Sequence, residues 1–204
     1  MILLDAAASR FDELVRPYGM TCDANQLMRE VIPKIRSANR ALNPLQLPSE
    51  LRDFWTWWHP EDFTSPAFDG FFSMDHALMK RDSMVALGYP ANLIPVAAFG
   101  KGVLWMELMS DAHFGSRVYY GAFSSSNLDL WTIGISGLLD LVNHTIELGG
   151  VTSWGDGQHR LDPRILHTVL ELHHRDLQAP EGEWSIPVAN PKSWPDHWQS
   201  YSPH

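Results

Sequence analysis

Apolar positions in the first part of the chain recur with the spacing of α-helices, in which side chains three or four positions apart share a face. This spacing predicts a helix over residues 5–18, whose apolar face carries Phe11, Leu14, Val15 and Tyr18. A second apolar stripe extends from Leu27 to Leu42. Pro33 falls within it and either breaks the segment or opens a further helical turn.

The stretch LPSELRDFWTWW (residues 47–58) predicts a third helix and places three tryptophans in four positions. Pro48 suits a first helical turn, and Glu50 complements its positive end. Around this helix one apolar stripe covers about 60° of arc and contains Leu47, Leu51, Phe54 and Trp58. We therefore expect Trp58 in the core together with Trp55, which flanks the stripe. Trp57 lies at its edge and is the tryptophan expected to stay partly exposed.

The period of the pattern changes from 3.6 to 2 after a helix expected over residues 74–87, which Ser73 caps and Gly88 ends. Residues 93–99 and 103–108 read as two strands joined by a tight turn at 100–102. Residues 117–123 predict a third strand and residues 130–133 a short fourth one.

Helical spacing returns twice in the last third of the chain. One amphipathic helix is expected from Ser136, its N-cap, to the Gly149-Gly150 pair, and Asp162-Pro163 begins the last helix. Residues 179–204 are rich in proline and tryptophan with little periodicity, which predicts an extended arm packed on the body. The pattern as a whole predicts one α+β domain over residues 1–204, with a mixed or antiparallel sheet of about four to six strands flanked by helices.

The order of these elements resembles that of the SMI1/KNR4-like, or SUKH, superfamily. LPSELRDFW is similar to the LP-x-x-h-x-x-F helix of that family, in which h is apolar. The other stretches that carry the resemblance are, in chain order, Ile35–Leu42, FFSMDHALMK (71–80), the hairpin Ile94–Leu108, the strand Arg117–Phe123 and the helix Ile135–Gly150. Together they cover about residues 30–150, and residues 151–204 would form a C-terminal helix and a Trp/Pro-rich arm outside this common core.

The resemblance implies an α+β domain with helices around a mixed or antiparallel sheet. Members of the family are mainly bacterial immunity proteins, which bind and neutralise toxins used in contact-dependent competition, and others act in fungal cell-wall regulation. The family shares no catalytic residues. We therefore expect a non-enzymatic protein that binds a protein partner and has no catalytic residue. We expect the protein to be a monomer or a weak homodimer.

Composition narrows the classes of partner. The net charge of −9 opposes binding to nucleic-acid backbones; it provides either solubility alone or a docking face for a basic partner such as a toxin domain. The single cysteine, Cys22, excludes an intramolecular disulfide and fits a reducing compartment. No apolar run reaches the ~20 residues of a membrane span. The short apolar stretch at the start has no basic n-region, so we do not expect a signal peptide. We expect a cytoplasmic protein that binds neither nucleic acid nor membrane.

The candidate partner-binding residues are Trp57, His59, Glu61 and Asp62. A tryptophan anchor with a polar rim is typical of protein interfaces, and the two acids suit a basic partner. Edge-of-core packing of Trp57 and a solvated acidic edge are the structural alternatives.

Two other functions remain open on the residues. A small carbohydrate-active hydrolase would use aromatic side chains and a pair of acids, chosen from Glu61, Asp62, Asp69, Asp75 and Asp111. The second open function is that of a regulatory scaffold protein without a toxin partner.

The ten histidines raise the question of a metal site. His167 and His174 share a helical face and His173 lies about 100° away, so a site would need His159 or Asp162 as further ligands. Solvated or locally hydrogen-bonded histidines are the commoner outcome, and we expect neither a metal nor a cofactor.

Overall fold

The computed structural model describes residues 2–18, 24–57, 71–99, 102–108, 116–122, 127–154, 158–176 and 185–187. Its helices are α1 (Ile2–Val15), the short 3-10 helix η1 (Arg16–Tyr18), α2 (Ala24–Leu42), α3 (Ser49–Trp57), α4 (Met74–Ala86), α5 (Gly134–Glu147) and α6 (Pro163–Asp176). Its strands are β1 (Leu93–Phe99), β2 (Gly102–Glu107), β3 (Arg117–Ala122), β4 (Asn127–Ile133), β5 (Val151–Trp154), β6 (Gln158–Leu161) and β7 (Ser185–Pro187).

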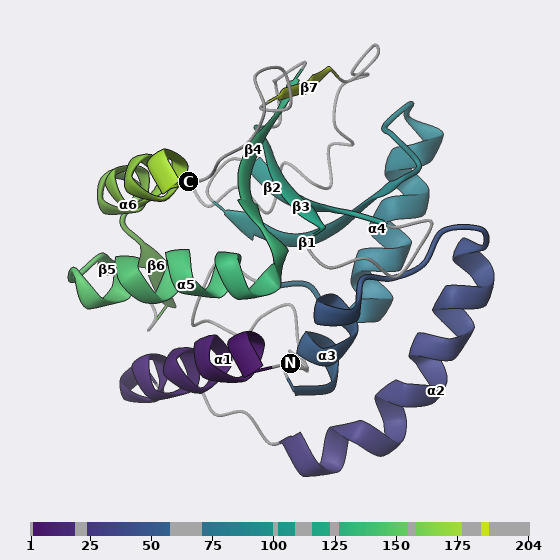
Figure 1. Cartoon of the computed structure of the whole chain (residues 1–204), viewed down its shortest axis with the longest axis horizontal. Helices are drawn as coiled ribbons and strands as arrows, with labels where there is room; N and C mark the ends of the chain where they lie inside the picture. Colours follow the sequence, from purple (N-terminus) through teal and green to yellow (C-terminus); the bar gives the residue numbers. More distant parts are fainter. Residues whose placement is uncertain are drawn as a thin grey trace.

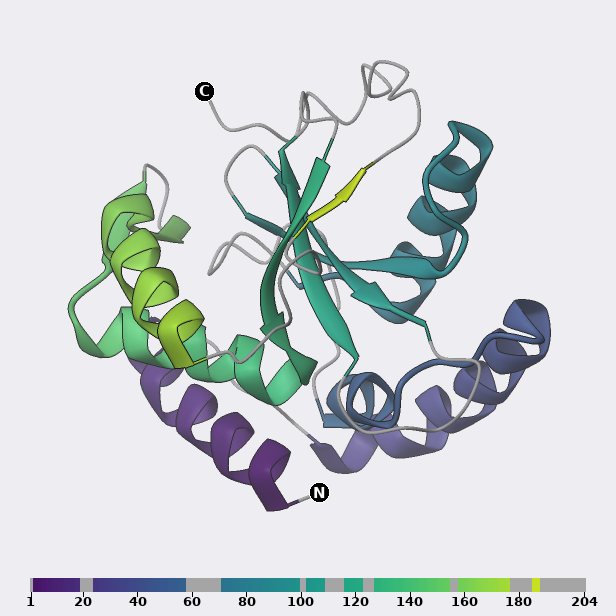
Figure 2. The ribbon, with the colours of Figure 1, turned by 45° about the horizontal axis from the view of Figure 1, so that its top comes forward.

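An antiparallel sheet with the strand order β1-β2-β3-β4-β7 forms the centre of the fold, and β5 and β6 form a separate hairpin. Helix α4 packs on β1, while α5 contacts β3 and β4. Figures 1 and 2 show α4 on one side of the sheet and α5 with α6 on the other, with α1 beside α5 and with α2 at the periphery beyond α3. The predicted α+β class with an antiparallel sheet and flanking helices is confirmed.

Strand β2 lies in the middle of the core. All of its residues from Gly102 to Met106 are buried, and only Glu107 is half-buried. A strand covered on both faces needs apolar side chains on both, which explains the nearly continuous apolar run. The tryptophan of this run, Trp105, stacks on Tyr89 with ring centroids 5.3 Å apart.

Most elements begin where the local pattern predicts. Ser73 caps α4 through its hydroxyl, which accepts a hydrogen bond from His76 N (3.4 Å). Asp162 caps α6, because its Oδ1 accepts hydrogen bonds from Arg164 N (2.8 Å) and Ile165 N (3.4 Å). The two strands of the β1–β2 hairpin also lie where they were expected.

Four features differ from the sequence-based expectations or resolve them. Helix α2 continues through Pro33, so the proline does not break it. Strand β4 begins at Asn127, earlier than expected, and the β5–β6 hairpin was not predicted. Ser136 is not an N-cap: α5 begins two residues earlier, at Gly134. The N–H groups at the start of α5 donate instead to a residue of α3, Glu50.

The C-terminal arm contributes to the sheet through its described residues. Ser185, Ile186 and Pro187 pair with β4 and make β7 the edge strand. The tryptophans of the arm lie outside the described residues. None of the described helices combines the length and the apolar character that a membrane-spanning helix requires.

Candidate functional site

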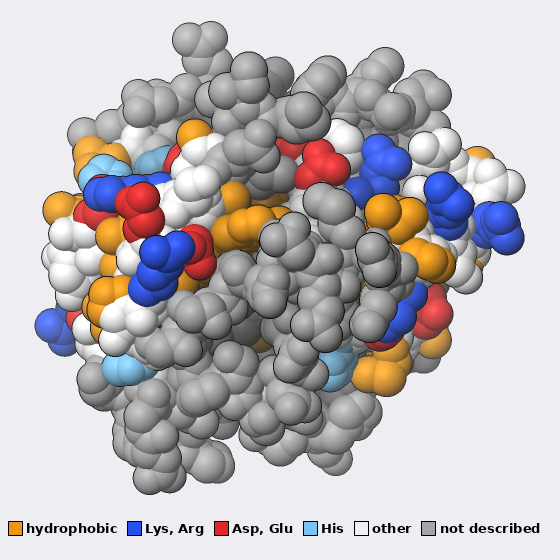
Figure 3. All heavy atoms as spheres, turned by 90° about the horizontal axis from the view of Figure 1, so that it is seen from below, with side chains coloured by type: hydrophobic (Ala, Val, Ile, Leu, Met, Phe, Trp, Pro, Cys, Tyr) orange, Lys and Arg blue, Asp and Glu red, His pale blue; other side chains and the backbone are white. Residues whose placement is uncertain are grey.

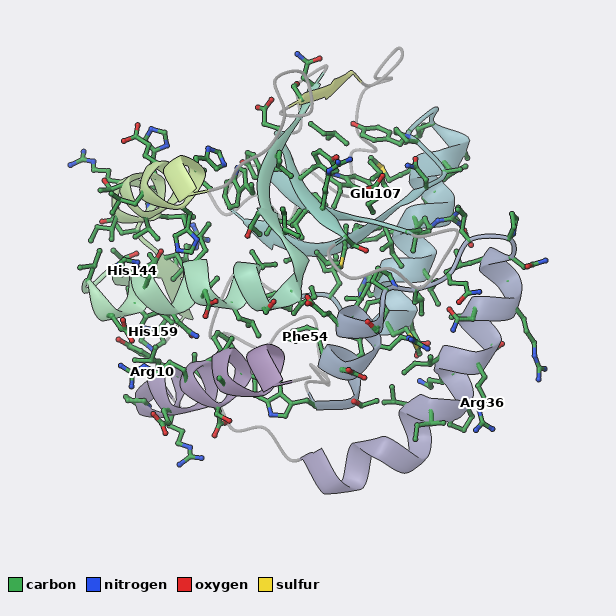
Figure 4. The ribbon with its side chains drawn as sticks, in the orientation of Figure 1. Arg10, Arg36, Phe54, Glu107, His144 and His159 are labelled. Atoms are coloured by element: carbon green, nitrogen blue, oxygen red, sulfur yellow. The ribbon has the colours of Figure 1, made fainter. Side chains whose placement is uncertain are left out.

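Helix α3 is anchored in the core by one of its sides. Leu51, Phe54 and Trp55 are buried, and the Trp55 indole donates a hydrogen bond from Nε1 to the Phe72 carbonyl oxygen (3.0 Å). Phe54, labelled in Figure 4, lies close to where α1, α3 and α5 meet. The sequence-based prediction that Trp55 belongs to the core is confirmed.

Trp57 lies at the edge of this core and is half-buried. Its ring makes an edge contact with Phe11 of α1 (centroids 6.3 Å apart, planes at 65°) and a tilted contact with Phe54 (6.1 Å, 51°). Such contacts fix the orientation of an aromatic ring. Trp57 therefore packs against the core and also presents part of its surface, which combines the two alternatives.

Asp53 lies one helical turn before Trp57 and is exposed. Positions four apart share a helix face, so this carboxylate and the indole lie on the same side of α3. The sequence analysis missed Asp53, although the i,i+4 spacing to Trp57 was the signal that would have found it. We define the α3 surface as Asp53 and Trp57.

Glu50 fixes the side of α3 that carries this surface. Its Oε2 accepts hydrogen bonds from Ile135 N (2.7 Å) and Ser136 N (3.3 Å) at the start of α5. A carboxylate at a helix N-terminus satisfies unpaired N–H groups and interacts favourably with the helix dipole. Gly134 makes room for it: φ is +73°, and a Cβ at this position would collide with the Glu50 carboxylate. Glu50 therefore caps a helix 85 residues away in sequence.

The remaining predicted site residues, His59, Glu61 and Asp62, lie outside the described residues, as does Trp58. Of the acids considered for a hydrolase, Asp75 is exposed on α4 and forms an ion pair with Lys34 Nζ of α2 (2.6 Å). Asp69 and Asp111 also lie outside the described residues.

The histidines are spread over several elements. His167 pairs with Glu171 one turn later on α6 (3.3 Å), and His159 packs on Tyr18 with ring centroids 4.7 Å apart. The rings of His144 and His173 lie 6.3 Å apart. Burial raises the pKa of Asp140 on α5, and the electrostatic interaction of its carboxyl group with His173 partly offsets that rise. Figure 4 shows His144 and His159 on the same side of the molecule. Within the described ranges, no three His, Cys, Asp or Glu side chains are grouped to hold a metal ion.

Lys80 of α4 is a buried cation that the sequence analysis missed. Its side chain is 6% exposed, and Nζ lies 4.8 Å from the centroid of the Phe72 ring. Burial lowers the pKa of Lys80 to about 8. Burial, followed by repulsion from Lys80, lowers the pKa of His76 to about 4. The available signal was position, since Lys80 lies three residues after Ala77 and four before Met84, both of which are buried.

We expect the free energy of unfolding to rise between about pH 8 and pH 10 because of Lys80. The folded chain releases the lysine proton near pH 8, whereas the unfolded chain holds it until about pH 10.5. In this window the unfolded state binds more protons, so stability increases with pH. Urea denaturation at a series of pH values measures the slope.

The Lys80→Met variant should lose this rise, because methionine fills a similar volume without a titratable group. The matched control is Lys34→Met, which removes an exposed lysine and should keep the rise. An unchanged slope in Lys80→Met would assign the effect to another group. Tyr89 and Tyr120 act mainly above pH 10 and in the opposite direction. Burial raises the pKa of both phenols, that of Tyr89 to about 12, so the unfolded chain ionises them first and stability falls there.

We compared the chain with protein-family models, with curated proteins and with solved structures, and none of the three comparisons gave a match.

Proposed function

We propose that this protein is a non-enzymatic protein-binding domain, and specifically an immunity protein that neutralises a toxin by direct, stoichiometric binding. The observation that carries the proposal is the half-exposed ring of Trp57, held by Phe11 and Phe54 beside the exposed carboxylate of Asp53. Tryptophans in such positions often dominate the binding energy of protein interfaces. A carboxylate beside the anchor suits a basic partner.

The support beneath the α3 surface favours binding without rearrangement. The Glu50 carboxylate ties α3 to the N-terminus of α5, and the Trp55 indole ties it to the Phe72 carbonyl. A surface that is already ordered in the free protein loses less conformational entropy on association. The α3 surface is therefore suited to binding a partner with high affinity, and neutralisation of a toxin requires high affinity.

Charge and the order of elements add support. The net charge of −9 increases the association rate with a basic toxin domain at low ionic strength. We also infer that the chain is an SMI1/KNR4-like protein. Helix α2, helix α3, helix α4, the β1–β2 hairpin, strand β3 and helix α5 follow one another in the order on which that resemblance rests. The proposed compartment is the cytoplasm, where the single Cys22 would stay reduced.

A capture experiment with matched variants tests the proposal. Immobilised wild-type protein is mixed at low and moderate salt with lysates of the host and of competing bacteria, and the bound proteins are quantified by mass spectrometry. We expect one dominant basic partner. Asp53→Lys should reduce its capture at least about tenfold, because a like charge replaces a complementary one beside the anchor. Glu171→Lys, which changes the charge by the same amount on exposed α6, should retain it.

The second stage distinguishes neutralisation from simple binding. The captured partner is expressed in a sensitive strain with the wild-type protein or with Asp53→Lys. Growth that is rescued by the wild type and not by Asp53→Lys supports the immunity function. Equal capture by Asp53→Lys and the wild type would show that the α3 surface is not the binding surface. A captured partner that is harmless to the cell would favour a regulatory scaffold instead.

A further inference from the structure

Helix α2 carries a row of polar and basic side chains on one side. We define the α2 stripe as Ile32, Arg36, Asn39, Arg40 and Asn43. Each member lies three or four positions from at least one other member, which places them on a common side of the helix and its C-terminal end. Ile32 is 41% exposed, so the stripe combines one exposed apolar side chain with two arginines and two carboxamide side chains.

The stripe is basic in an acidic protein. Residues 31–49 contain Lys34, Arg36 and Arg40 and no aspartate or glutamate, whereas the whole chain has a net charge of −9. Figure 3 shows Lys and Arg side chains on the right-hand side of the face seen from below, where α2 runs. This stretch of α2 therefore carries a net positive charge within an acidic chain.

The arginines of the stripe lie away from the buried side of α2. Val31, Ile35, Ala38 and Leu42 form the buried side of α2, and Lys34, on another flank, bonds Asp75 of α4. Arg36 and Arg40 are exposed, and within the described part of the chain neither guanidinium has a hydrogen bond or an ion pair. Figure 4 shows Arg36 extending from α2 at the edge of the molecule.

A shallow hollow adjoins the stripe at the end of α2. Its volume is about 380 Å³, and it is lined by Asn39, Arg40, Asn43 and Gln46. Asn39 is oriented by its Oδ1, which accepts a hydrogen bond from Leu47 N (3.0 Å). The lining offers guanidinium and carboxamide N–H donors, a set that suits carboxylate oxygens.

We propose that the α2 stripe is a docking site for an acidic segment of a partner protein. Carboxylates of that segment bind Arg36 and Arg40, with one of them in the hollow beside Asn43, and an apolar side chain of the segment covers Ile32. Charge complementarity decides the occupant. A nucleic acid fits less well, because the net charge of the chain repels a phosphate backbone and such a backbone leaves Ile32 uncovered. This site lies on a different helix from the α3 surface, has the opposite charge, and does not depend on the proposed function.

Fluorescence anisotropy with a fluorescein-labelled peptide of glutamates and two leucines tests the proposal on the full chain. We expect the wild type to bind the peptide at low ionic strength. Arg36→Gln/Arg40→Gln should raise the Kd at least about tenfold, since two charged contacts are lost. Arg40→Gln alone should raise it by about threefold or more. Arg164→Gln, which removes an exposed arginine of α6, is the matched control and should leave the Kd unchanged within about twofold.

The proposal is overturned if the wild type does not bind the peptide, or if the double variant binds it with the same Kd as the wild type. It is also overturned if Arg164→Gln loses as much affinity as the double variant, because that would indicate a general charge effect. Displacement of the peptide by a single-stranded oligonucleotide that binds more tightly would assign the stripe to nucleic acid instead. Asp53→Lys should bind the peptide at least as well as the wild type, so the α2 stripe and the α3 surface can fail separately. Circular dichroism confirms that each variant is folded.

Discussion

Trp55→Ala should lower the free energy of unfolding by about 3–5 kcal/mol, the cost typical of removing a large buried aromatic side chain. Trp55 is 1% exposed, so its removal leaves a cavity between α3 and the chain around Phe72. The substitution also leaves the Phe72 carbonyl oxygen without the indole N–H that it accepts at 3.0 Å. Urea denaturation followed by far-UV circular dichroism measures the change.

Two further variants separate these contributions. Trp55→Phe keeps most of the apolar volume and loses the hydrogen bond, and we expect a cost of about 1–3 kcal/mol. Trp57→Ala removes a half-buried ring and should cost less than Trp55→Ala. If the two alanine variants cost the same, the assignment of Trp55 to the core and Trp57 to its edge would be wrong.

The second large effect is expected at Glu50. Glu50→Ala removes the acceptor of two N–H groups at the start of α5 and should cost about 2 kcal/mol, because capping contributes about 0.5–2 kcal/mol and the acceptor here is charged. Glu50→Gln keeps one oxygen acceptor and loses the charge, so we expect roughly half that cost. The same denaturation experiment measures both.

Glu171→Ala is the control for Glu50, since it removes an exposed glutamate from α6 and should change stability by less than about 0.5 kcal/mol. Hydrogen exchange adds a local measurement. The amides of Ile135 and Ser136 should exchange faster in Glu50→Ala, while those at the start of α6, which Asp162 caps, should not change. Unchanged protection at Ile135 and Ser136 would contradict the tertiary cap.

Local signals predicted much of the fold. The caps at Ser73 and Asp162 involve hydrogen bonds to residues only two or three positions away, so the residues that decide them are adjacent in the chain. The change from helical to strand periodicity likewise reflects the local backbone. For these reasons the expected positions of α4, β1, β2 and α6 agree with the structure.

The elements that were missed depend on distant residues. Ser136 had the composition of an N-cap, yet Glu50 caps α5 from a different helix. Strand β7 is three residues long and forms because β4 offers an unpaired edge. Neither outcome is visible in a local window, because each partner lies far away in sequence.

The candidate site was predicted in part. Helical spacing placed Trp57 at the edge of an apolar stripe, and the structure places it there, half-buried. Spacing does not reveal which rings a side chain meets, so the contact with Phe11 of α1 required the fold. The basic α2 stripe was overlooked because the net charge of −9 is a sum over the chain and hides a cluster of opposite sign.

The sequence by itself determined the α+β class, the helix and strand segments with local caps and clear periodicity, and the core position of Trp55. These properties depend on backbone preferences and on spacing along one element. Only the tertiary structure decided that Glu50 caps α5, that Lys80 is buried over Phe72, and that Arg36 and Arg40 face outward from α2. The reason is physical: burial and electrostatic environment are set by whichever elements pack together, and packing joins residues that no local pattern connects.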